Sequence, residues 1–113
     1  MSVVLYHNPK CSTSRNVLAL LREQGVEPTV VEYLKTGWDR ETLQRLASKM
    51  GVGLSGLLRK KEADAKALLD AGADDETLLA ATIAQPILIE RPIVETDKGA
   101  VIGRPVERVL DVL

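Results

Sequence analysis

The chain opens with a strand pattern, a helix pattern and a second strand pattern. Val3–Tyr6 is a short apolar run that predicts a buried strand, and the Asn8-Pro9 turn signal ends it. A helical pattern starts at about Thr13, places its apolar residues on one broad face, and meets Gly25 where a C-cap glycine belongs. The β-branched residues of Thr29–Leu34 predict a second strand. A helical crossover between two strands indicates a β-α-β unit with a parallel strand pair.

The middle of the chain has a helical pattern. Asp39 is a plausible N-cap for a helix that Gly51 ends, and Asp74 or Asp75 can cap another helix that stops before Pro86. Between them we expect a short helical turn ending near Arg59 and a weaker helix over Ala63–Leu69. The apolar residues assigned to these helices and the turn are Leu43, Leu46, Ala47, Met50, Leu54, Leu57, Leu58, Leu78, Leu79 and Ile83.

The last third changes to strands and a final helix. Ile93–Thr96 and Ala100–Ile102 flank Asp97-Lys98-Gly99, which is a hairpin signal. Pro105 suits the first turn of a helix, for which we predict a buried stripe. That stripe comprises Val106, Val109, Leu110 and Leu113. The order β-α-β, helices, β-β-α predicts an α/β layer fold with a mixed sheet and an inserted helical segment, in a single domain over residues 1–113.

Composition excludes several classes of function. Hydrophobic residues are 45% and charged residues 27%, as in ordinary globular domains, and the net charge of -1 disfavours a dominant nucleic-acid footprint. No apolar run approaches the ~20 residues that span a bilayer. The first ten residues lack a signal-peptide layout, so we expect a cytoplasmic chain without a membrane partner. One cysteine and one histidine allow neither an internal disulfide nor a structural zinc site.

The single cysteine, Cys11, falls between the first strand and the first helix. Unpaired N–H groups and the helix dipole favour an anion there, and the same N–H groups could hold a tetrahedral oxyanion. Lowering a thiol pKa of ~8.5 by about two units needs about 2.7 kcal/mol. The helix end supplies roughly 1 kcal/mol, and His7, Lys10 and Arg15 could supply the rest. Alternatively, Cys11 is a small buried apolar residue, as free cysteines often are.

Two spacings narrow the chemistry. Ser14 stands where a dithiol oxidoreductase has its second cysteine, so an oxidised Cys11 needs an outside thiol to resolve it. Arg15 follows Cys11 too soon for the loop of a cysteine phosphatase. His7 could raise the thiolate fraction as a cation, act as a base, or simply be a loop histidine bonded to the backbone.

The segment from Tyr6 to Asn16, YHNPKCSTSRN, resembles the active-site segment of the glutaredoxin-coupled arsenate reductases. The resemblance continues in LLRKK at 57–61, in PILIERPIV at 86–94 and in GRP at 103–105. It spans essentially the whole chain. The Cys-x-x-Ser motif is weak alone, but it is specific together with three arginine motifs in this order. Ser12 departs mildly, since some members carry glycine there.

This resemblance implies a thioredoxin-like three-layer fold, with Cys11 attacking arsenate to form a thiol–arsenate adduct. Glutathione then reacts with the adduct, glutaredoxin reduces the mixed disulfide, and arsenite leaves. By motif, Arg59, Arg91 and Arg104 bind the oxyanion, and a cis bond is expected at Arg91–Pro92. His7 and Ser14 carry over as residues that assist thiolate formation.

The resemblance further implies no tightly bound cofactor, with glutathione as co-substrate. Arsenate, glutathione and glutaredoxin are the expected partners of a monomeric chain. Three convergent guanidinium groups would stabilise charge on arsenate during attack, since arginine stays charged and binds paired oxygens through its planar fork.

Two other functions remain open. The chain could be a glutathione-linked thiol oxidoreductase that acts on mixed disulfides or another oxyanion. It could also be a binding module like the Spx-type regulators, which contact RNA polymerase and resemble this family. Those regulators typically carry a Cys-x-x-Cys switch, and Ser14 in place of the second cysteine counts against this reading.

Overall fold

The computed structural model describes residues 2–113 and contains two compact units. The sheet unit combines the residues up to Thr36 with Arg91–Leu113, and the helical unit is Gly37–Glu90. The inserted helical segment predicted from the sequence is therefore present as a compact body. The expectation of one domain over the whole chain stays a prediction.

The sheet unit is built on four strands in the order β2-β1-β3-β4. Their bounds are Val3–Tyr6 for β1, Thr29–Val31 for β2, Ile93–Thr96 for β3 and Gly99–Ile102 for β4. β1 pairs parallel with β2 and antiparallel with β3, and β4 completes a hairpin with β3. The predicted mixed sheet and α/β class are confirmed.

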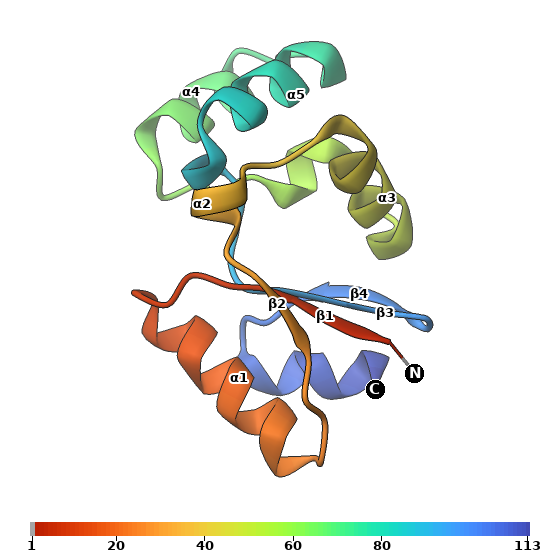
Figure 1. Ribbon diagram of the computed structural model, residues 1–113. Helices are drawn as coiled ribbons and strands as arrows, with labels where there is room; N and C mark the ends of the chain where they lie inside the picture. Colours follow the sequence, from red (N-terminus) through yellow and green to blue (C-terminus); the bar gives the residue numbers. More distant parts are fainter. Residues whose placement is uncertain (1) are drawn as a thin grey trace. The chain divides into compact units, whose positions relative to one another are not determined.

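One face of this sheet carries the core of the unit. Helix α1, Ser12–Glu23, and the final 3-10 helix η3, Val106–Val112, both lie against that face, as Figure 1 shows. Alternate residues of each strand point to the same face, so the inward positions of β1 and β3 meet the helices. The buried residues of this cluster are Val3, Leu5, Val17, Leu21, Val94, Val109 and Val112.

The second predicted strand is wrong at its end. β2 stops at Val31, and Tyr33–Thr36 forms the short helix α2. The Thr36 amide N–H donates to the Glu32 carbonyl oxygen at 3.1 Å, and Gly37 follows in the left-handed region at φ 76°. A glycine directly after a turn of helix is a stop signal, and it outweighed the β preference of the apolar run.

The predicted stripe of the final helix is also partly wrong, because the helix has 3-10 geometry. With three residues per turn, residues three apart share one face, so the buried residues are Val109 and Val112. Leu110 is 42% exposed rather than buried. Pro105 precedes the helix as its N-cap instead of lying in its first turn.

The helical unit contains three α-helices of at least two turns and two short 3-10 segments. They are α3, Arg40–Met50; η1, Leu54–Leu57; α4, Ala63–Asp70; α5, Asp75–Ala84; and η2, Pro86–Leu88. The predicted caps are confirmed, since Asp39 accepts from the Thr42 N–H at 2.7 Å and Asp74 from the Thr77 N–H at 2.9 Å. Gly51, at φ 68°, ends α3 in the left-handed conformation.

Two segments of the helical unit are joined by a small antiparallel bridge at Leu58 and Ile89. The Arg59 N–H donates to the Leu88 carbonyl oxygen at 2.8 Å, and the Glu90 N–H donates to the Leu57 carbonyl oxygen at 2.7 Å. These two hydrogen bonds fix the backbone at Arg59 and Glu90.

Candidate active site

Cys11 is the N-cap of α1, and the loop after β1 holds it there. Its N–H donates to the Asn8 carbonyl oxygen at 3.0 Å, and its own carbonyl oxygen accepts from the Arg15 N–H at 3.0 Å. The Asn8 side chain also accepts from the Lys10 N–H at 3.0 Å, which closes the turn. The thiol therefore lies at the positive end of a helix dipole, as the sequence predicted.

Three residues surround the Cys11 sulfur with donors and positive charge. Arg104 Nη2 lies 3.5 Å from Cys11 Sγ, and the Arg91 side chain also donates to the sulfur. Burial acts to raise the pKa of the Cys11 thiol. The Ser14 backbone N–H, the Arg91 hydrogen bond and the charges of Arg104 and Arg91 outweigh burial, so the pKa is lowered from its ordinary value. The site favours a thiolate.

The β3–β4 hairpin explains how two arginines distant in sequence reach one sulfur. Arg91 lies two residues before β3 and Arg104 lies two residues after β4, and the hairpin pairs Ile93 with Ile102. Arg104 Nε donates to the Arg91 carbonyl oxygen at 2.7 Å, which fixes one arginine against the other. The expected cis bond at Arg91–Pro92 is confirmed, and Arg104–Pro105 is also cis.

His7 and Ser14 form a buried pair behind the Cys11 loop. His7 Nδ1 lies 2.6 Å from Ser14 Oγ, and Ser14 Oγ also accepts from the Asn8 N–H at 3.1 Å. Ser14 thus serves the site twice, because its hydroxyl ties down the loop while its backbone N–H faces the thiol.

The charge of His7, which the sequence left open, is set mainly by burial. Burial lowers the pKa of His7, Glu32 raises it, and the charges of Arg15 and Arg22 lower it further, for a net decrease. This favours a neutral imidazole at neutral pH. A neutral ring with an unprotonated Nδ1 can accept a hydrogen bond from the Ser14 hydroxyl, and it adds no positive charge beside the sulfur.

Arg59, the third predicted arginine, belongs to the helical unit. Its guanidinium Nη1 donates to Glu90 Oε1 at 2.9 Å, and Nε lies 3.8 Å from Glu62 Oε1. The sequence analysis missed Glu90, although its place directly before Arg91 was a possible signal. The structure brings together Cys11, Arg91, Arg104, Ser14 and His7 in the sheet unit.

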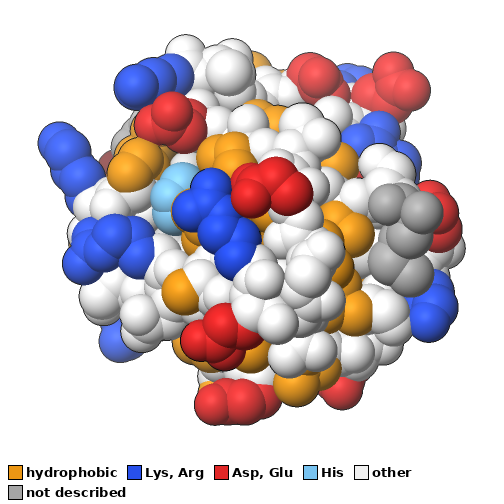
Figure 2. Space-filling model, turned by 60° about the horizontal axis from the view of Figure 1, so that its bottom comes forward, with side chains coloured by type: hydrophobic (Ala, Val, Ile, Leu, Met, Phe, Trp, Pro, Cys, Tyr) orange, Lys and Arg blue, Asp and Glu red, His pale blue; other side chains and the backbone are white. Residues whose placement is uncertain are grey.

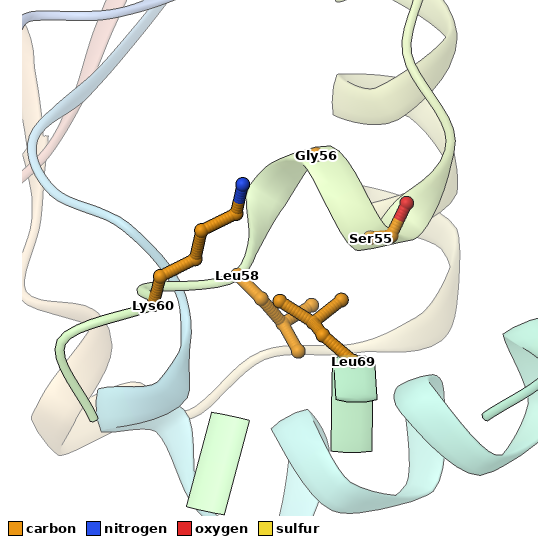
Figure 3. Close-up of a pocket in the computed structure, with 5 residues that line it drawn as sticks. All are labelled: Ser55, Gly56, Leu58, Lys60 and Leu69. Atoms are coloured by element: carbon orange, nitrogen blue, oxygen red, sulfur yellow. The ribbon is translucent and has the colours of Figure 1, made fainter. Parts of the chain in front are cut away.

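A hollow of about 330 Å³ lies in the helical unit (Figure 3). Leu58 and Leu69 form its apolar part, and Lys60 extends from the segment after Leu58. Gly56 and Ser55 complete the lining. None of these lining residues is among the predicted site residues.

The surface of the molecule carries charges of both signs. Figure 2 shows basic and acidic side chains interspersed on one face, in keeping with the net charge of -1. Within residues 2–113, no helix is long and apolar enough to cross a bilayer. The same residues contain no cluster of three or more His, Cys, Asp or Glu suited to a metal ion.

An activated thiol on a helix N-terminus, with two arginines donating to it, defines a thiol-based anion site on an α/β fold. The chain belongs to the ArsC family, whose model matches residues 6–112. It is similar to the solved arsenate reductase of Vibrio cholerae, with 47% identity and a TM-score of 0.91 over 100% of this chain and 98% of that one.

Two further relatives match nearly the whole of this chain, and the matched share of their own length differs. The arsenate reductase of Rhizobium meliloti (strain 1021) is 44% identical over 100% of this chain and 82% of its own length. The uncharacterized protein YfgD of Escherichia coli (strain K12) is 46% identical over 98% of this chain and 96% of its own length. The family resemblance inferred from the sequence is confirmed by these matches.

Proposed function

We propose that this protein reduces arsenate to arsenite, with Cys11 as the nucleophile. The observation that carries the proposal is the Cys11 sulfur at the N-terminus of α1, with Arg104 Nη2 at 3.5 Å and further hydrogen bonds from Arg91 and the Ser14 N–H. Relatives named arsenate reductase match 100% and 99% of the chain at 44% and 42% identity, which supports the same substrate.

In the proposed reaction, the Cys11 thiolate attacks arsenic and an oxygen of arsenate leaves as water after protonation. The guanidinium groups of Arg91 and Arg104, with Arg59 as the third ligand, offset the negative charge of the oxyanion. Lowering the thiol pKa raises the thiolate fraction at neutral pH, which is the form that attacks. One chain supplies the nucleophile and the arginines, so the chemistry needs no second copy.

The reducing electrons must come from outside the chain, because Cys11 is its only cysteine. A glutathione thiolate attacks the adduct, arsenic keeps the electron pair of its bond to sulfur and becomes As(III), and Cys11 is left in a mixed disulfide with glutathione. Glutaredoxin then removes the glutathione and restores the thiol. The cytoplasm, where glutathione is kept reduced, is the compartment that this chemistry requires.

The test measures arsenate-dependent oxidation of glutathione, with and without glutaredoxin. We expect turnover in the wild type, none in Cys11→Ser, and weakened arsenate binding in Arg91→Met and Arg104→Met. Arg108→Met is the matched control, because Arg108 is an exposed arginine of η3, and it should behave as the wild type. Turnover that survives in Cys11→Ser would refute the assigned chemistry.

A second arm separates the alternatives left open by the sequence. The same proteins are offered a glutathionylated protein in place of arsenate. Removal of glutathione from that substrate, combined with no arsenate turnover, would identify a thiol oxidoreductase with another substrate.

A further inference from the structure

Arg59 is held by carboxylates rather than left open to an anion. Its Nη1 donates to Glu90 Oε1 at 2.9 Å. The Arg59 side chain is 13% exposed and the Glu90 side chain is 22% exposed. Glu62 Oε1 lies 3.8 Å from Nε on another side of the guanidinium. A charge-assisted hydrogen bond at this depth is stronger than a pair in bulk water.

The backbone holds Arg59 and Glu90 next to each other. Arg59 and Glu90 flank the Leu58–Ile89 bridge, where backbone hydrogen bonds of 2.8 and 2.7 Å fix both segments. In this antiparallel pairing Arg59 lies opposite Leu88, and Glu90 is two positions further along the facing segment. Such diagonal neighbours are close enough for long side chains to touch. The paired backbone segments therefore keep the Arg59 and Glu90 side chains within contact distance of each other.

Arg59 still has donor capacity for another acceptor. Its Nε is buried and makes no hydrogen bond within the part of the chain that the structure describes. A buried donor without an acceptor is unfavourable, so Glu90 does not satisfy the whole guanidinium. The guanidinium thus combines an unsatisfied donor with a carboxylate that already offsets its charge.

We propose that Glu90 is a positioning residue that weakens and thereby sets the oxyanion affinity of Arg59. Its carboxylate holds the guanidinium and competes with an incoming tetrahedral oxyanion for the same positive charge. The effect acts on charge, so it applies to arsenate and phosphate alike. This inference rests on the proposed function, in which Arg59 is an oxyanion ligand.

A second arginine–glutamate pair in the same unit provides a matched control. Arg40 donates to both carboxylate oxygens of Glu76, at 2.7 and 2.6 Å, and the two side chains are 51% and 70% exposed. The pair has the same chemistry as Arg59–Glu90, but water screens it. Removing the charge of Glu76 should leave anion binding unchanged.

The experiment titrates the Cys11→Ser protein with arsenate, and separately with phosphate, in a calorimeter. Cys11→Ser prevents turnover but leaves the three arginines in place. Glu90→Gln and Glu76→Gln are each added to it. Glutamine keeps an oxygen that can accept from Arg59, so the substitution removes charge while it retains the contact. We expect Glu90→Gln to tighten both anions about tenfold, equal to ~1.4 kcal/mol, and Glu76→Gln to change neither.

Kinetics on the protein with Cys11 intact provide a readout that a purely structural role would not move. Glu90→Gln should lower KM for arsenate about tenfold with kcat unchanged, since it alters binding without touching the reacting sulfur. Glu90→Asp keeps the charge on a shorter side chain and should tighten binding less than Glu90→Gln. This second variant maintains the test if Glu90→Gln lowers the melting temperature.

Each outcome decides between distinct readings. Unchanged anion binding in Glu90→Gln overturns the inference. Weaker binding overturns it too, because Glu90 would then orient Arg59 for the anion rather than compete with the anion. If Arg59→Met binds anions as well as its parent, Arg59 is not a ligand and the inference falls, while Cys11-dependent turnover still supports the proposed function. Absence of arsenate turnover in the wild type would refute the proposed function alone, since anion binding is measured separately.

Discussion

Replacing Arg104 by methionine removes a positive charge within hydrogen-bonding distance of the Cys11 sulfur. Arg104 Nη2 lies 3.5 Å from Sγ, a separation at which two unit charges attract by about 1.2 kcal/mol in water. Arg104 is half-buried, so this fully screened figure is a lower bound. It corresponds to a factor of roughly eight in the equilibrium between thiol and thiolate.

The thiolate fraction is measured through the pH dependence of Cys11 alkylation by iodoacetamide. Cys11 is the only cysteine, so the reaction reports on one site. The pKa of Cys11 is lowered in the wild type, and the thiolate therefore forms at lower pH than in an ordinary thiol. In Arg104→Met we expect the midpoint of alkylation to move to higher pH, with a decrease of roughly eightfold in thiolate at a given pH well below the midpoint.

Arg108→Met is the control for this experiment, because it removes an exposed arginine four residues further along the chain. Its alkylation profile should match that of the wild type. An unchanged profile in Arg104→Met would refute the reasoning, since it would show that the guanidinium contact does not stabilise the thiolate. A shift of equal size in both variants would indicate a general effect of net charge.

Three further outcomes are expected. Ser14→Ala should lower the free energy of unfolding, measured in urea, by about 1–3 kcal/mol, because the His7 ring and the Asn8 N–H lose their buried partner. The same variant should leave Cys11 alkylation nearly unchanged, because the backbone N–H of residue 14 remains. Burial lowers the pKa of His7 from 6.5, so its contribution to stability is full above that pH and is lost as the pH falls through the lowered value; a His7→Gln variant that showed the same acid dependence would contradict this. Gly103→Ala should destabilise the fold by about 1–3 kcal/mol in thermal unfolding, since its Cβ would lie 2.8 Å from Val17 Cγ2, and an unchanged melting temperature would show that α1 can yield there.

Local signals in the sequence predicted most of the elements correctly. The Asp39 cap and Gly51 stop of α3 depend on side-chain and backbone chemistry within a few residues, and both were confirmed. The strand over Thr29–Leu34 was overextended because a β-branched run and a helix stop at Gly37 competed within a few positions. The stripe of the final helix was wrong because an apolar pattern does not distinguish 3.6 from 3.0 residues per turn over so short a segment.

The site divides in the same way between local and distant information. The position of Cys11 at a helix N-terminus followed from neighbouring residues. The contact of Arg104 with that sulfur joins residues 93 positions apart, which no periodicity reports. The family resemblance implied Arg104 only as an oxyanion ligand. The carboxylate on Arg59 was missed for the same reason, because Glu90 is 31 positions away.

The placement of the helical unit inside the sequence of the sheet unit has a consequence for folding. The sheet is incomplete until β1 meets β3, and the Tyr6–Glu95 hydrogen bond closes a separation of 89 positions. Closing so long a loop costs entropy and slows folding. The hydrogen bond from Trp38 Nε1 to the Pro86 carbonyl oxygen, at 3.3 Å, joins the beginning and end of the intervening segment. If the helical unit forms early in refolding, the Trp38–Pro86 contact brings the two ends of the inserted segment together and shortens the loop between β1 and β3. Trp38 fluorescence would then change before the sheet is complete.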